Sequence, residues 1–319
     1  MNDTEARILE PGQIEAPTGE IRFLFLPGRD LFARRAERFR ALSPGHPLGE
    51  YLGFLALLAD SQQEALDRFP SLAPPTPEEQ ALCRQHGMPL LAARSWRRNP
   101  AWREGLTLIL RRVGGADVPA AAREAASNLL AAAETKLEEL ADQILAGDPA
   151  AVPPTELVFV AAALQAYWVH MATTLGEGAF ARLEAGGVCP VCGSSPASGI
   201  VRADGSELGL RYLSCSLCAS QWHMVRLKCS ACEAAEGLSY YSLEGTNGAV
   251  KAESCPDCNT YLKLLYLGKD GRMEATADDL ATLALDMLMA EAGKVRGGPN
   301  LYLHPGEVEE ASGGAEPWQ

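Results

Sequence analysis

Four Cys-x-x-Cys pairs constrain this chain more than any other feature of its sequence. The second two pairs repeat the spacing of the first two 40 residues later, so the region is a tandem repeat of a unit with two pairs. Within each unit 22 residues separate the pairs, and 10 residues separate the units. In order along the chain the pairs are Cys189 and Cys192, Cys215 and Cys218, Cys229 and Cys232, and Cys255 and Cys258.

Each unit supplies four thiols, the number that a tetrahedral metal ion needs. Zinc binds four cysteine sulfurs at ~2.3 Å, and the ion stabilises units that are too small to fold on their own apolar core. Between the pairs of each unit, turns at Asp204-Gly205 and Glu244-Gly245 predict a β-hairpin. The sequence therefore predicts two tandem rubredoxin-like or zinc-ribbon metal domains, with independent structural or redox dithiols as the alternative.

The identity of the metal is left open by these residues, because thiolate coordination suits both zinc and iron. Gly193 follows the first pair, as is typical of such metal-binding turns. The other three pairs are followed by Ala219, Glu233 and Asn259, so the equivalence of the two sites is also left open.

The chain before Gly186 has the pattern of an all-α domain. Apolar residues at helical spacing predict helices over 31–42, 48–69, 102–112, 120–145 and 155–183. After the cysteines, Thr276-x-x-Asp279 resembles a capping box, and residues up to Met287 and Leu288 then continue one apolar helical face. We expect a multidomain α+β protein with a helical domain over 1–185 that has its own core, metal ribbons over 186–226 and 227–270, and a C-terminal helix and tail over 271–319.

Composition narrows the class of protein further. A net charge of −13 disfavours nucleic acid, whose binding rests on Lys and Arg displacing counterions. The most apolar stretch, 157–171, is shorter than the ~20 residues that cross a bilayer, and the first 20 residues lack the pattern of a signal peptide. We therefore expect a cytoplasmic protein without membrane insertion, whose nine cysteines stay reduced.

No catalytic constellation stands out in the sequence. A Ser-His-Asp arrangement, a phosphate loop and a dinucleotide fingerprint are not recognisable in the required context. His223 is interpreted as a strand residue beside the first site, and Asp278 and Asp279 as carboxylates of a helix start. Cys83 has no partner motif and is interpreted as a structural thiol. His46 and His170 also lack ligand spacing and are interpreted as capping or core residues. We expect a protein that is not an enzyme.

Several longer stretches together resemble one known family. They are "RRAERFRALSPGHPLGEYLGFLALLADSQ", "LQAYWVHMA", "CPVCGSSP", "LRYLSCSLCASQWHMVRLKCSAC", "ESCPDCNTYLKLLY" and "ADDLATLALDMLMAEAG". The cysteine pairs alone occur in many metal proteins, but their combination with the helical stretches is specific. Over nearly its full length the chain resembles the formate dehydrogenase accessory proteins of the FdhE family.

The resemblance implies a function, a location and a cofactor. It implies a cytoplasmic assembly factor, or chaperone, that binds immature respiratory formate dehydrogenase through its catalytic and iron–sulfur subunits. It also implies two rubredoxin-like iron sites, one at each set of four cysteines, with zinc as the alternative metal. A homodimer is left open. The competing hypothesis is a rubredoxin-like electron-transfer or redox-sensing protein.

Overall fold

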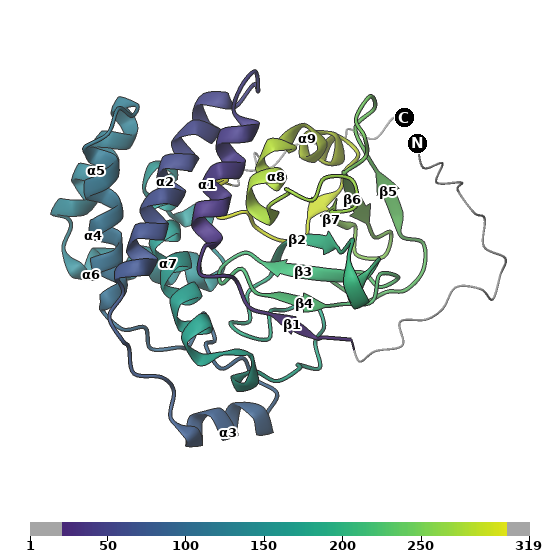
Figure 1. The fold of residues 1–319 in the computed structure, drawn as a ribbon, viewed down its shortest axis with the longest axis horizontal. Coiled ribbons are helices and arrows are strands. Elements are labelled where there is room, and N and C mark those ends of the chain that lie inside the picture. Colours follow the sequence, from purple (N-terminus) through teal and green to yellow (C-terminus); the bar gives the residue numbers. More distant parts are fainter. Residues whose placement is uncertain (1–20, 305–319) are drawn as a thin grey trace, which may run out of the picture.

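A computed structural model describes residues 21–304 of the chain (Figure 1). The first 20 residues and the acidic tail from Glu307 lie outside the described residues. The helices are α1 (Leu31–Leu42), α2 (Gly49–Arg68), α3 (Pro77–Gln85), α4 (Ala101–Gly114), α5 (Ala120–Ala131), α6 (Glu134–Ala146), α7 (Pro154–Leu175), α8 (Ala275–Ala281) and α9 (Leu283–Glu291). The strands are β1 (Leu24–Phe25), β2 (Pro196–Val201), β3 (Arg211–Cys215), β4 (Gln221–His223), β5 (Ser239–Tyr241), β6 (Val250–Ser254), β7 (Thr260–Tyr266) and β8 (Val295–Arg296).

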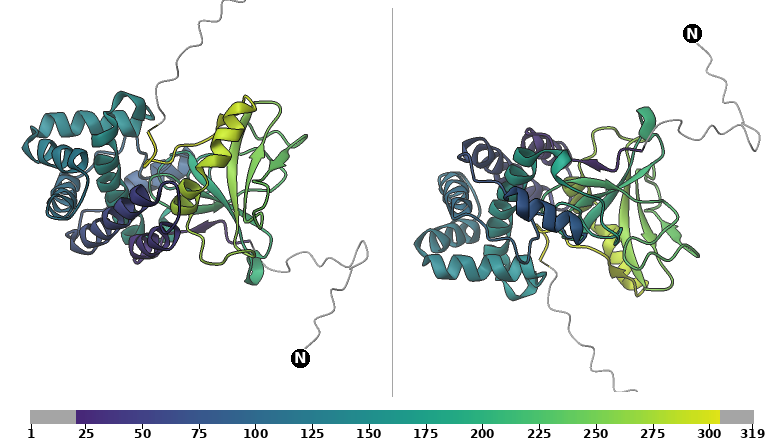
Figure 2. Two further views of the ribbon diagram at one scale, coloured as in Figure 1. Left: turned by 90° about the horizontal axis from the view of Figure 1, so that it is seen from above. Right: turned by 90° about the horizontal axis from the view of Figure 1, so that it is seen from below.

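Helices α1 to α7, here called the helical layer, lie on one side of the molecule and the sheet on the other (Figure 2). Helix α7 is the core of this layer, and its residues from Leu157 to Val169 are all buried. Among the described residues it is the one helix long and apolar enough to cross a membrane, but 83% of its apolar window is buried inside the fold. The expectation of a buried core helix is therefore confirmed.

Two of the predicted helices have different bounds in the structure. The segment 120–145 forms two helices, because Ala132 and Ala133 adopt extended backbone angles between α5 and α6. Alanine favours helices, so no residue in this stretch marks the break. Helix α7 ends at Leu175 and not at 183, because Gly176 adopts φ 75°, outside the helical region.

The two cysteine units share one sheet. Its strand order is β1-β4-β3-β2-β7-β6-β5, and β8 pairs with β7. The predicted hairpins are β2 with β3 and β5 with β6, and the turn residues Gly205 and Gly245 both have positive φ. Parallel pairing of β2 with β7 joins the units at Gly199, where a Cβ atom would lie 2.5 Å from the Leu264 side chain. Glycine at this position permits the close approach of the two strands.

A buried ion pair crosses the junction between the units. The Arg211 guanidinium of β3 pairs with the Glu253 carboxylate of β6, and both side chains are almost fully buried. Arg211 also donates to the carbonyl oxygens of Val225 (2.7 Å) and Lys228 (2.6 Å), in the segment that connects the units. Tyr240 donates to the other Glu253 oxygen at 2.9 Å. The ion pair and the bond from Arg211 to Lys228 fix one unit relative to the other, and the Tyr240 bond holds the Glu253 carboxylate within the second unit.

The helical domain does not have the separate core that the sequence suggested. One continuous apolar cluster contains Leu52 of α2, Trp168 of α7 and Leu213 of β3, together with all four cysteines of the first unit. The prediction was wrong because the first unit has little apolar mass of its own and packs directly against α7. Loss of order in the first unit should therefore destabilise the helices that pack against it.

The C-terminal segment forms two short helices that lie against the sheet (Figure 1). The capping box predicted at Thr276 is wrong, because Glu274 is the N-cap of α8 and accepts hydrogen bonds from the Thr276 and Ala277 amides. Met287 and Leu288 are 62% and 50% exposed, although the periodicity placed them on the buried face. The break at Thr282 rotates α9 relative to α8 and turns these side chains outward.

We predict that Arg211→Met destabilises the protein by about 3–5 kcal/mol, because it leaves the buried Glu253 carboxylate without its partner. The double change Arg211→Met with Glu253→Leu should recover most of this loss. The measurement is the free energy of unfolding by chemical denaturation. The matched control is Arg272→Met, since the Arg272 side chain is 84% exposed and its pair with Asp270 should contribute less than ~1 kcal/mol. A single variant as stable as this control would contradict the assignment.

Candidate metal centres

The eight paired cysteines form two groups of four in space. The first tetrad consists of Cys189, Cys192, Cys215 and Cys218, and the second tetrad of Cys229, Cys232, Cys255 and Cys258. In each tetrad the four sulfur atoms all lie within 4.8 Å of one another. The grouping is the one that the repeat spacing predicts, so residues 215–232 contribute the end of one tetrad and the start of the next. Each tetrad could hold a metal ion.

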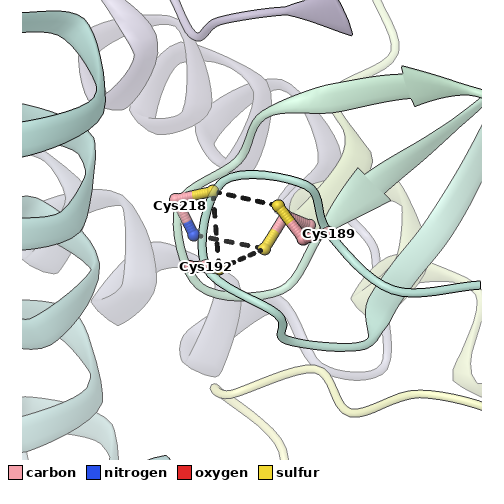
Figure 3. A group of neighbouring side chains, drawn as sticks. Cys189, Cys192 and Cys218 are labelled. Atoms are coloured by element: carbon pink, nitrogen blue, oxygen red, sulfur yellow. Dashed lines mark hydrogen bonds between the residues drawn. The ribbon is translucent and has the colours of Figure 1, made fainter. Parts of the chain in front are cut away.

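The first tetrad converges from two turns that face each other (Figure 3). The Cys189 and Cys218 sulfurs are 3.5 Å apart, and the Cys192 sulfur lies 3.4 Å from that of Cys215 and 3.7 Å from that of Cys218. The backbone amides of Leu217 and Cys218 both donate to the Cys215 sulfur at 3.4 Å. Such hydrogen bonds stabilise the thiolate that a metal ion requires.

The second tetrad has the same plan at slightly larger distances. The Cys229 and Cys258 sulfurs are 3.6 Å apart, and those of Cys232 and Cys255 are 3.7 Å apart. The Ala231 amide donates to the Cys229 sulfur at 3.4 Å. Four sulfurs at ~2.3 Å from a tetrahedral ion would be about 3.8 Å from each other, so both donor sets fit zinc or iron.

A positive φ angle follows every cysteine pair. We call each Cys-x-x-Cys turn with its next residue a knuckle. The closing residues have φ of 75° at Gly193, 55° at Ala219, 60° at Glu233 and 59° at Asn259, and the last three are the non-glycine residues with positive φ in the described part of the chain. The left-handed conformation costs a non-glycine residue about 1–2 kcal/mol. All four knuckles thus have the same backbone shape although only one carries glycine.

Helix α7 and the connection between α3 and α4 hold the two knuckles of the first tetrad. The amides of Leu91 and Ala93 donate to the carbonyl oxygens of Val191 (3.0 Å) and Cys192 (2.8 Å). On the opposite side, the Gln165 side chain of α7 donates to the Ser216 carbonyl oxygen at 2.8 Å. The Gln165 amide oxygen in turn accepts hydrogen bonds from buried side chains of α1, α2 and the C-terminal segment. The first tetrad is therefore fixed at the junction of helices and sheet.

The second tetrad lies at the surface of the sheet layer. Cys229 and Cys255 are buried, but Cys232 is exposed and Cys258 is half-buried. Its knuckles are held by surface hydrogen bonds. The Gly186 amide donates to the Glu233 carboxylate at 2.8 Å, and the Asn259 side chain donates to the Gly293 carbonyl oxygen at 2.6 Å.

The pKa shifts do not separate the two tetrads. At Cys192 burial acts to raise the pKa, but hydrogen bonds with the other three thiols outweigh it and lower the pKa well below the usual value, whereas burial raises the pKa of Cys229 in the second tetrad. Burial raises the pKa of Cys189 and Cys215 well above the usual value, because the interior disfavours an uncompensated thiolate. Burial acts in the same direction on Cys258, but hydrogen bonds to the Thr260 hydroxyl and backbone outweigh it and lower the pKa of Cys258 to about 7. A bound cation would supply charge compensation for the thiolates of either tetrad.

The other residues considered from the sequence lie outside both tetrads. His223 packs edge-on against the Tyr212 ring in the sheet, and burial lowers its pKa. His46 accepts the Leu48 amide hydrogen bond with Nδ1, as a capping residue would. Cys83 is half-buried in α3 as a free thiol. None of these three residues therefore belongs to a tetrad.

The two aspartates of α8 belong to separate ion pairs. Asp278 pairs with Arg38 of α1, while the buried Asp279 lies 3.0 Å from the Lys263 ammonium group and also pairs with Arg296. These carboxylates hold α8 to the helical layer and to the sheet. Both carboxylates are therefore engaged in ion pairs.

Sequence reasoning missed an apolar cavity of about 540 Å³ in the helical layer. Most of its lining is apolar, with side chains from α2, α7 and the C-terminal segment, including Phe54, Leu157, Phe159, Leu301 and Leu303. The sequence carries no signal for it, because the lining residues come from segments far apart in the chain.

We predict that Gly193→Ala lowers stability by about 1–2 kcal/mol, because alanine must adopt the left-handed angles of the first knuckle. Gly178→Ala is the matched control. Gly178 has no positive φ and no atom within 4 Å of an added Cβ, so its change should be neutral or slightly stabilising. Denaturant unfolding of both variants provides the comparison. Equal stability of the two would show that the knuckle imposes no such strain.

We predict different consequences for the two tetrads when their first pairs are changed to serine. Cys189→Ser with Cys192→Ser should remove one of two metal ions and raise amide exchange in α7 by roughly tenfold or more, because the first tetrad shares the helical core. Cys229→Ser with Cys232→Ser should remove the other ion and leave α7 unchanged. Metal analysis and hydrogen exchange test this. Loss of both ions in either variant would contradict independent sites.

Family models match nearly the whole described chain. The model described as "FdhE, N-terminal" matches residues 21–185, "FdhE, central domain" matches 188–226, and "FdhE, C-terminal domain" matches 227–303. The first tetrad therefore lies in the central match and the second in the C-terminal match.

Full-length relatives agree with these matches. The chain is 46% identical over 306 residues to the protein FdhE homolog of Pseudomonas aeruginosa, covering 94% of this chain and 98% of the relative. It is 47% identical over 311 residues to the homolog of Edwardsiella ictaluri, covering 94% and 99%. The crystal structure of the FdhE protein from Pseudomonas aeruginosa superposes with a TM-score of 0.81 at 44% identity, covering 90% of this chain and 100% of that one. The chain belongs to the FdhE family of formate dehydrogenase accessory proteins.

Proposed function

We propose that this protein is a maturation factor for respiratory formate dehydrogenase, which binds the immature enzyme through a metal-stabilised scaffold. The observation that carries the proposal is the full-length family match together with the convergence of all eight paired cysteines into two tetrads. In this proposal the cysteines of both tetrads are metal ligands. The two ions are iron, as the family resemblance implies, or zinc.

The metal would supply charge compensation for the thiolates and folding energy for the two units. Residues of the chain orient the knuckles and fix the two units relative to each other. Gln165 and the amides of residues 91 and 93 orient the knuckles of the first tetrad, and Arg211 fixes the second unit relative to the first. The result is a rigid surface in which helices and sheet keep one relative position. We further propose that residues 1–185, 186–226, 227–270 and 271–319 are the parts of this scaffold.

The protein acts by binding and not by catalysis in this proposal. The residues considered as acid or base, Asp278 and Asp279, form ion pairs that hold α8 in place, which supports a structural role for them. The partners are the catalytic and iron–sulfur subunits of formate dehydrogenase, and the encounter takes place in the cytoplasm before export. The net charge of −13 supports a protein partner over nucleic acid.

We predict that deletion of the gene in its host abolishes assembled formate dehydrogenase activity, because the immature enzyme would lack its maturation factor. The measurement is formate oxidation by membranes of cells grown under conditions that induce the enzyme. Expression of the wild-type chain, or of the Gly178→Ala control, should restore activity. Activity that is unchanged by the deletion would refute the proposal.

The exposed Cys232 thiol favours one second candidate, an electron-transfer or redox-sensing protein. An iron ion at the second tetrad would lie close enough to the surface to exchange electrons with a partner. Zinc has no redox chemistry. A colourless protein that contains only zinc and has no reducible centre would exclude this candidate and leave the maturation factor in place.

A further inference from the structure

The two tetrads repeat one sequence spacing but have opposite surroundings. In the first tetrad all four cysteines are buried, and so are the four residues between the paired cysteines, Pro190, Val191, Ser216 and Leu217. In the second tetrad Cys232 is exposed, and of the corresponding residues Ala231, Pro256 and Asp257 are exposed. A solute can therefore approach the second tetrad through the face of Cys232. The four cysteines of the first tetrad are buried, and the cavity of about 580 Å³ that adjoins Cys192 does not expose its side chain.

The hydrogen bonds that hold the knuckles differ in the same way. The first knuckle is held by residues 91 and 93, and this segment is itself fixed by the Trp168 indole, which donates to the Leu91 carbonyl oxygen at 2.9 Å. Opening the first tetrad thus requires the core of the helical layer to open. The second tetrad is held by Glu233 and Asn259, two exposed side chains that bond to the Gly186 amide and the Gly293 carbonyl oxygen.

These differences determine how fast a bound metal ion can leave. Segments with few buried contacts and exposed hydrogen bonds open at low free energy, whereas segments within a core open only with the core. A thiol or chelator must reach the bound metal ion before it can replace the cysteine ligands. At the second tetrad it can do so from solvent at Cys232. At the first the sulfur atoms are buried, so the knuckle residues that line the adjoining cavity must move before a chelator reaches the ion.

We propose that the two sites have different roles. The second tetrad is an exchangeable site for a metal ion such as zinc or ferrous iron, and the first tetrad is a structural site whose metal ion exchanges slowly. The inference rests on the proposed assignment of the eight cysteines as metal ligands and adds a separate role for each site. The metal at the second tetrad can then change while the helices and the first tetrad stay folded.

The exchangeable site lies beside an exposed part of the chain. The segment that leads into Cys229 carries Val225 and Leu227, whose side chains are 53% and 70% exposed. Arg211 anchors the backbone of this segment through its bonds to Val225 and Lys228. Its last residues lead directly into the third knuckle, so this exposed apolar segment lies next to the exchangeable site.

The test uses the full chain, purified without oxygen and loaded with zinc. An excess of the chromogenic chelator 4-(2-pyridylazo)resorcinol is added, and zinc release is followed with time. We expect two phases of one ion per chain each, with the fast phase on the order of tenfold faster or more. N-ethylmaleimide labelling during the fast phase, read by peptide mass spectrometry, should modify the four cysteines of the second tetrad and spare those of the first.

Two variants assign the phases. Cys232→Ser should abolish the fast phase and leave the slow phase unchanged. Gln165→Ala removes the hydrogen bond to Ser216 without touching a ligand, so it should speed the slow phase alone. Release of two ions in one phase, or labelling of the first tetrad before the second, would overturn the inference while leaving the ligand assignment intact. A chain that binds no zinc would overturn both the assignment and the inference.

Discussion

The convergence of four cysteine sulfurs at the junction of helices and sheet is the constraint on which the rest of the structure depends. The first unit has too little apolar surface to fold alone. It is stabilised by its own tetrad and by packing against α7. Gln165 connects these two supports, because its side chain bonds one knuckle and also the buried side chains of Arg35, Gln62 and Tyr302. Metal binding and helical packing are thus parts of one cooperative core.

The second unit depends on the first through the sheet. Parallel pairing of β2 with β7 and the buried pair of Arg211 with Glu253 transmit the position of the first unit to the second. A buried ion pair adds little net stability, but its geometry excludes other arrangements of the two units. The second tetrad can therefore remain exposed without loss of its place in the molecule. The position of the second tetrad thus does not depend on its burial. Two sites with the same sequence pattern can therefore differ in their accessibility to solvent.

The sequence predicts features that repeat or have a strong local signal. It does not predict features that are set by contacts between distant segments. The spacing of the cysteines predicts both tetrads, and Gly205 and Gly245 predict the hairpin turns. The break between α5 and α6 falls within an alanine-rich stretch, where no residue marks it. The shared core and the salt bridges of α8 with Arg38 join residues far apart in the chain, so no local pattern could show them. The burial difference between the tetrads is invisible in the sequence for the same reason.

The central claim is that each tetrad binds one metal ion through its four cysteines. Anomalous X-ray diffraction from crystals of anaerobically purified protein, measured at the iron and zinc absorption edges, tests it most directly. The account predicts two peaks per chain, one at the centre of each tetrad. Tetrads closed by disulfide bonds, or a peak at only one of them in fully reduced protein, would contradict it.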